Sequence, residues 1–149
     1  MLAVLQRVTH AEVRVDGNVV GSIQRGWVVL LGVAQGDTLN DAEWISAKVL
    51  GLRAFGDNDG KMNLSVAESG GSILVVSQFT LLADCQKGRR PSFTGAAPPQ
   101  EAEPLYEAVC SLLERANLPI KRGVFRAHMA VELVNDGPVT LLLDSREKT

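Results

Sequence analysis

Two short, almost wholly apolar runs constrain the fold of this chain most strongly. Residues 27–33 and 73–76 are rich in valine, leucine and isoleucine and are too short for buried helices. A run of this kind is typical of a strand that is covered on both faces. The chain is therefore predicted to build its core around the centre of a buried sheet.

Further strands are predicted on both sides of these runs. Residues 12–23 alternate apolar and polar positions around the turn sequence Asp16-Gly17-Asn18, which predicts a hairpin. Residues 129–134 alternate in the same way, and residues 139–143 are β-branched or aliphatic throughout. These patterns predict two late strands, with an ordinary turn between them.

Two helices complete the prediction. A helix is expected to open at Asp37-Thr38, with Asn40 and Glu43 as a capping pair, and to end near Gly51. A second helix is expected to have one apolar stripe and to carry Pro104 in its first turn. The stripe consists of Leu105, Val109, Leu112, Leu113 and Ala116. With only two crossover helices, an α/β or α+β layered domain is favoured over a doubly wound sheet.

Size and charge narrow the class of protein. A chain of 149 residues with 46% hydrophobic residues can bury one core, so we expect a single domain over residues 1–149. No apolar run approaches the roughly 18 to 20 residues that span a bilayer, and no signal peptide is recognisable, so we expect a cytoplasmic protein. The net charge of −2 argues against binding polyanions by overall charge, but it permits a local basic patch.

Motifs for metals and cofactors are missing from the sequence. There is no nucleotide-binding glycine loop and no paired set of cysteine and histidine, and Cys85 and Cys110 are too few for a disulfide framework. Residues 57–60, Asp-Asn-Asp-Gly, favour a tight turn over a calcium loop. His10 and His128 have no companions in the sequence that would indicate a catalytic triad. We therefore expect no metal and no cofactor.

Two polar stretches remain to be explained. The first, Ser77-Gln78-Phe79-Thr80-Leu81, follows a predicted buried strand, and strand ends are where open α/β sheets present their sites. The second is Asn135-Asp136-Gly137-Pro138-Val139-Thr140. On composition alone, each is more often a simple turn.

Taken together, the two stretches resemble the motif pair of the D-aminoacyl-tRNA deacylases. The resemblance extends in order through Gln6-Arg7-Val8, Gly60-Lys61-Met62-Asn63-Leu64, Gly70-Gly71-Ser72 and Arg90-Pro91-Ser92-Phe93, from end to end of the chain. Two positions depart from the family pattern. Arg126 stands where a small residue is expected, and His128 stands where another polar residue is common.

The resemblance implies an α/β fold in which layered β-sheets form a barrel-like core with two packed helices. It also implies a homodimer, with sites at the subunit interface, that hydrolyses the ester of D-aminoacyl-tRNA or glycyl-tRNA. Neither a membrane nor DNA is an expected partner. An aminoacyl ester is already activated, so positioning and oxyanion stabilisation suffice and no metal is required.

The resemblance also assigns roles to residues. It implies that Gly137-Pro138 is a cis peptide whose carbonyl groups enter the partner's pocket and exclude L side chains, that Arg7 braces this motif, and that Met129 contributes to substrate binding. An X-Pro bond is cis in only about 5 to 6% of cases, so the sequence itself does not predict that state. Glycine has no side chain to clash and should pass the same filter.

For the ester, the backbone N–H groups of Phe79 and Thr80 are candidates for an oxyanion hole, with Ser77 and Gln78 ordering the strand end. Thr80 as a nucleophile needs an adjacent base. We therefore favour assistance by the ribose 2′-hydroxyl of the tRNA.

Basic residues are candidate contacts for tRNA phosphates, although solvated loops are their ordinary role. They are Lys87, Arg89, Arg90, Lys121, Arg122 and Arg126. Two other functions stay open: a general esterase with Thr80 as nucleophile, and a non-catalytic RNA-binding domain.

Overall fold

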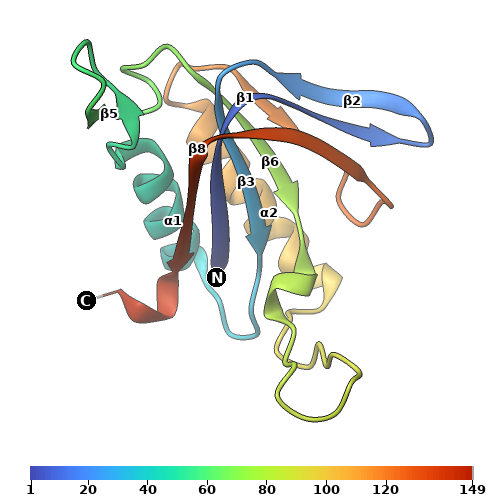
Figure 1. Ribbon diagram of the computed structural model, residues 1–149. Helices are drawn as coiled ribbons and strands as arrows, with labels where there is room; N and C mark the ends of the chain where they lie inside the picture. Colours follow the sequence, from blue (N-terminus) through green and yellow to red (C-terminus); the bar gives the residue numbers. More distant parts are fainter. Residues whose placement is uncertain (149) are drawn as a thin grey trace.

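The computed structural model describes residues 1–148 and is organised around one strongly curved sheet (Figure 1). Its path runs β2-β1-β3-β6-β7, and β8 pairs with β1 outside this path. The strands are β1 (Leu2–Val15), β2 (Asn18–Ile23), β3 (Gly26–Gly32), β6 (Ser72–Ser77), β7 (Ile120–Arg122) and β8 (Ala130–Asp144).

The two apolar runs form β3 and β6, as predicted, and they pair in parallel at the centre of the sheet. Their side chains alternate between two clusters of buried residues. Trp27 and Val29 belong to the cluster under the helices, whereas Val28 and Leu74 belong to the cluster on the other side of the sheet. Coverage on both faces explains why these strands carry almost no polar residues.

The strand β1 connects the two halves of the sheet. Its residues 2–8 pair with β3 and its residues 11–15 pair with β2, while β8 runs along its other edge. The predicted hairpin is confirmed, with Asp16 and Gly17 at positive φ. The sheet curls until β2 nearly meets β7. Their closeness is seen at Gly21 of β2, where an added Cβ would lie 2.6 Å from the carbonyl oxygen of Arg122 in β7. The barrel-like core is therefore nearly closed.

The two helices, α1 (Leu39–Gly51) and α2 (Pro99–Glu114), pack against the sheet in the larger buried cluster. Short elements fill the connections: β4 (Phe55–Gly56) pairs with β5 (Met62–Leu64), and single turns of 3-10 helix form η1 (Phe79–Leu82) and η2 (Ser145–Glu147). The predicted α/β architecture with two packed helices is confirmed.

The predicted bounds of the first helix are confirmed, but its capping pair and the start of the second helix were wrong. The first cap uses Thr38, whose N–H donates to Asp41 Oδ2 at 2.8 Å, rather than the pair of Asn40 and Glu43. The second helix begins at Pro99, so Pro104 lies inside it rather than in its first turn. A proline at the first helical position loses no hydrogen bond, and this explains the earlier start.

The predicted turn between two late strands was also wrong. The strand β8 continues through Gly137 and Pro138 without reversing direction. Its register instead slips: Gln6 faces Thr140 and Val8 faces Asn135, so two steps along β1 correspond to five along β8. The intervening residues form a bulge on the edge of the sheet.

The predicted tight turn after β4 is confirmed. Asp57 Oδ1 accepts the backbone N–H groups of Asp59 and Lys61 at 2.9 and 3.0 Å. Among the helices in residues 1–148, none has the length and apolar character needed to cross a bilayer.

Candidate functional site

A cavity of about 910 Å³ opens where β6 ends. Its walls come from the end of β6, from η1, from the first half of α2 and from the segment that leads into β8. The polar and aromatic residues of the lining are Ser77, Gln78, Phe79, Thr80, Phe93, Tyr106, Phe125, Arg126 and His128, and Met129 is among its apolar residues. Among residues 1–148, no aspartate or glutamate lines it.

The chain reverses out of the sheet directly after Ser77. The N–H of Gln78 still donates to the carbonyl of Leu31 at 2.7 Å, and then η1 begins. The strand β3 passes close by, since a Cβ on Gly32 would lie 3.0 Å from the carbonyl oxygen of Gln78 and 2.6 Å from the side chain of Leu82. Because Gly32 has no side chain, residues 77–80 can pack closely against β3 at the edge of the cavity.

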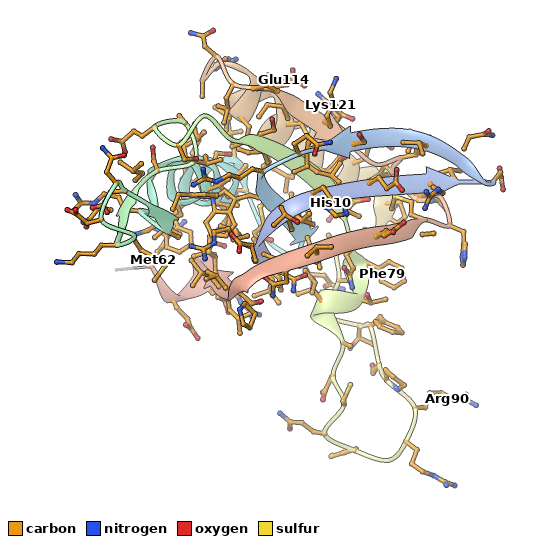
Figure 2. All side chains as sticks on the ribbon, turned by 45° about the horizontal axis from the view of Figure 1, so that its top comes forward. His10, Met62, Phe79, Arg90, Glu114 and Lys121 are labelled. Atoms are coloured by element: carbon orange, nitrogen blue, oxygen red, sulfur yellow. The ribbon has the colours of Figure 1, made fainter. Side chains whose placement is uncertain are left out.

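The start of η1 presents unpaired polar groups. Within residues 1–148, the N–H groups of Phe79 and Thr80 have no hydrogen-bond acceptor, as is usual for the first amides of a helix. The Gln78 carboxamide donates to Thr80 Oγ1 at 3.1 Å. The phenyl ring of Phe79, labelled in Figure 2, packs edge to face on Phe93 with centroids 5.2 Å apart.

The opposite wall is the segment between β7 and β8. Met129 Sδ accepts the N–H of Val124 at 3.4 Å, and Gly123 leaves room for this sulfur, which an added Cβ would approach to 2.6 Å. Phe125 stacks on Tyr106 with centroids 5.6 Å apart. Burial raises the pKa of the Tyr106 phenol, so this hydroxyl stays protonated and adds no charge to the cavity.

The second polar stretch lies apart from this cavity. Gly137 and Pro138 are exposed on β8 and do not line it, and the peptide bond between them is cis. Gly137 has φ 123°, and a Cβ there would lie 2.9 Å from the side chain of Val139 and 3.0 Å from Arg7 Nη2. This position therefore excludes a side chain on both conformational and steric grounds.

Side chains brace the bulge from both ends. The half-buried Arg7 donates from Nη1 to the carbonyl of Ala54 at 2.7 Å and from Nε to the carbonyl of Asp136 at 3.3 Å. Asn135 accepts the N–H of Val139 at 3.2 Å and donates to Thr140 Oγ1 at 3.0 Å. Arg7 thus reaches the carbonyl immediately before Gly137, and it ties the bulge to the neighbouring connection.

The predicted phosphate contacts fall into separate groups. Lys87, Arg89 and Arg90 are exposed on a loop closed by two hydrogen bonds between Asp84 and Ser92. Figure 2 shows Arg90 on this projecting loop and Lys121 at the far side of the molecule. Arg126 lines the cavity.

Arg122 differs from the other cations in this set. It forms ion pairs with Glu107 and Glu114, which raise the pKa of its guanidinium. Because its charge is already compensated, Arg122 is a poor candidate for contact with phosphate.

Several contributors were not identified from the sequence. The sequence does not identify Tyr106 and Phe125 as cavity lining, because an aromatic residue beside a helical stripe or a strand usually belongs to the hydrophobic core. Asn135 belongs to the second polar stretch, but nothing in the sequence indicates that its side chain braces the bulge. Among residues 1–148, no group of three acidic, histidine or cysteine side chains is placed to hold a metal ion.

Comparison with known proteins places the chain among tRNA deacylases. The family model described as D-Tyr-tRNA(Tyr) deacylase matches residues 4–144. The D-aminoacyl-tRNA deacylase of Anaeromyxobacter dehalogenans is 62% identical over 146 residues, covering 98% of each chain. That of Thermotoga petrophila is 57% identical and covers 97% of each.

Two solved structures have the same fold. The structure titled c-Myc DNA Unwinding Element Binding Protein has a TM-score of 0.91 at 44% identity and covers 97% of this chain and 98% of its own. A probable eukaryotic D-amino acid tRNA deacylase has a TM-score of 0.78 at 17% identity, covering 95% and 97%, and shows the shared fold alone. With the match over residues 4–144, the chain belongs to the D-Tyr-tRNA(Tyr) deacylase family.

Proposed function

We propose that this protein hydrolyses the ester bond of D-aminoacyl-tRNA and of glycyl-tRNA, releasing the amino acid and tRNA in the cytoplasm. The observation that carries the proposal is the Ser77–Thr80 segment, which offers free amides at a cavity that no carboxylate of residues 1–148 lines, in a chain of the deacylase family. The family's named substrates supply the substrate class.

The chemistry follows from the groups at the start of η1. The N–H groups of Phe79 and Thr80 have no other acceptor within residues 1–148, so they are free to stabilise the oxyanion that develops on the ester carbonyl. The Thr80 hydroxyl is held by the Gln78 carboxamide, which is not a base. We therefore assign assistance to the ribose 2′-hydroxyl of the substrate, and the reaction requires no metal or cofactor.

Selection against L-aminoacyl groups is assigned to Gly137 and Pro138 of a second subunit. In one chain these residues lie outside the cavity, on an edge strand that also exposes apolar side chains: Leu142 is 78% exposed and Val134 is 45% exposed. A symmetric dimer through this face would cover that surface and bring each bulge to the other subunit's cavity. Rigid backbone there excludes an L side chain by steric contact, while glycine passes.

Contacts with the tRNA backbone are assigned to the exposed loop with Lys87, Arg89 and Arg90 and to Lys121 and Arg126. None of these five forms an ion pair with a residue between 1 and 148. Arg122 is left out because two glutamates already neutralise it. Neutralising the loop should weaken tRNA binding and flatten its salt dependence.

One assay separates the proposal from its alternatives. The protein is incubated with matched D-aminoacyl-, L-aminoacyl- and glycyl-tRNA, and release of the amino acid is followed. Hydrolysis of the D and glycyl esters alone supports the proposal, and equal hydrolysis of D and L esters indicates a general esterase. No hydrolysis with retained tRNA binding indicates a binding domain, and preference for duplex DNA in competition would contradict the expectation that DNA is not a partner.

A further inference from the structure

Arg126 occupies a backbone conformation that few side chains adopt. It lies in the turn closed by the hydrogen bond from the Ala127 N–H to the Val124 carbonyl at 3.1 Å, and its φ is 68°. A left-handed residue other than glycine, asparagine or aspartate is uncommon and costs free energy. An arginine that is exposed at such a position invites a functional explanation.

The turn is fixed at both of its ends. Before Arg126, Phe125 packs on Tyr106 of α2. After it, Met129 is held by the N–H of Val124 and by the space at Gly123. Because these anchors lie in the cavity wall, the turn presents Arg126 at the rim rather than on a mobile loop.

The charge of Arg126 is uncompensated. Within residues 1–148 its guanidinium has no hydrogen bond and no ion pair, and no carboxylate lines the cavity beside it. Two other arginines near this part of the sheet are neutralised: Arg14 by Glu12 and Glu132, and Arg122 by Glu107 and Glu114. The rim of the cavity therefore carries a positive charge that a bound anion can neutralise.

We propose that Arg126 binds the phosphate that joins the terminal nucleoside of the RNA to the rest of the chain. This inference rests on the proposed function. When the ester lies against Phe79 and Thr80, the 5′ side of the same nucleoside must leave the cavity at its rim. The α-amino group of the substrate is a cation and would be repelled by Arg126, whereas a phosphate matches the planar donors of guanidinium.

The test compares two minimal substrates, the D-aminoacyl ester of adenosine and the same ester of adenosine 5′-monophosphate. We expect the protein to favour the phosphorylated ester about tenfold in kcat/KM, the size of one charge-assisted hydrogen bond. Arg126→Gly should abolish this preference, so that the two esters are hydrolysed with equal kcat/KM, because glycine accepts the same φ and keeps the turn. Arg126→Lys should retain part of it, and Arg115→Gln, an exposed cation at the other end of α2, should retain all of it.

The inference is overturned if the preference survives in Arg126→Gly, if the wild-type protein shows none, or if both esters lose activity equally. A second measurement separates it from the proposed function. If neither ester is hydrolysed, calorimetry with adenosine and adenosine 5′-monophosphate still reports the contact. Tighter binding of the monophosphate that disappears in Arg126→Gly supports the inference without catalysis, and equal affinity in both proteins contradicts it.

Discussion

The two polar stretches of this chain are built in opposite ways. Residues 77–80 end a buried strand and leave two backbone amides without an acceptor among residues 1–148, at a cavity, whereas residues 135–140 bulge from an edge strand and pair side chains with one another. Free groups suit a surface that must bind a substrate. A bulge braced by neighbouring side chains suits a rigid piece of backbone that is inserted into another subunit, and this difference underlies the proposal of a site shared between two subunits.

The largest effect is expected at the bulge. Gly137→Ala places a Cβ 2.9 Å from Val139 and 3.0 Å from Arg7, so the bulge must move, and D-aminoacyl-tRNA hydrolysis should fall about 100-fold or more. Gly17→Ala is the matched control, because Gly17 also has positive φ but no atom within 4 Å of the added Cβ. Deacylation rates and thermal unfolding are measured for both. Retained activity in Gly137→Ala would remove the bulge from the site.

Mixing two inactive chains tests whether the regions belong to one site in different subunits. Gly137→Ala is coexpressed with Phe79→Pro, which removes one of the two backbone N–H groups assigned to the oxyanion, and the mixture is compared with each variant alone. In a shared site, a mixed dimer keeps one intact pair of regions, and random pairing should restore about a quarter of wild-type activity. If each chain holds a complete site, the mixture stays as inactive as its components.

A smaller loss is expected when the brace is weakened. Arg7→Lys keeps the charge but cannot reach the carbonyls of Ala54 and Asp136 together, so the bulge should loosen. We expect the rate of D-aminoacyl-tRNA hydrolysis to fall roughly tenfold. The ratio of the L-aminoacyl to the D-aminoacyl hydrolysis rate should rise. Thermal unfolding is recorded alongside. A lower melting temperature with an unchanged ratio of L to D hydrolysis would limit Arg7 to a structural role, through its hydrogen bonds and its ion pair with Asp136.

Removing the hydroxyl at the strand end should matter less than moving the bulge. Thr80→Ala keeps the backbone amide and the ribose 2′-hydroxyl of the substrate, so single-turnover deacylation should stay within about tenfold of wild type. A 2′-deoxy terminal nucleotide should reduce the rate far more. Near-total loss in Thr80→Ala with intact tRNA binding would instead identify Thr80 as the nucleophile.

The smallest effect on activity is expected far from both regions. Burial raises the pKa of Asp41, but hydrogen bonds from the Thr38 N–H and from Ser145 and Lys148 outweigh it and lower the pKa from 3.8 to about 2. A depressed pKa stabilises the fold above pH 4, and this contribution disappears as the pH falls towards 2.

Asp41→Asn should therefore cost about 1 to 2 kcal/mol of unfolding free energy at pH 7 and leave deacylation unchanged. Denaturant unfolding at pH 7 and pH 3 measures the difference. If the difference in unfolding free energy between the wild type and Asp41→Asn is as large at pH 3 as at pH 7, the charge of the carboxylate is not its source.

Local patterns were sufficient for the central strands, the β1–β2 hairpin and the existence of two helices, because alternation and apolar runs depend on neighbouring residues. They failed for the capping pair of the first helix, at Pro99 and at the bulge in β8. Glycine followed by proline reads as a turn in isolation, and only pairing with β1 on one side and bracing by Arg7 and Asn135 keeps the strand extended.

The sequence by itself determined the class of fold, the two polar stretches and the absence of recognisable metal and nucleotide motifs. The tertiary structure decided that one stretch lines a cavity and the other does not, that Arg122 is neutralised, and that Arg126 remains uncompensated at the rim. These outcomes depend on groups distant along the chain, such as Arg122 and Glu107 or Phe125 and Tyr106, which only folding brings together.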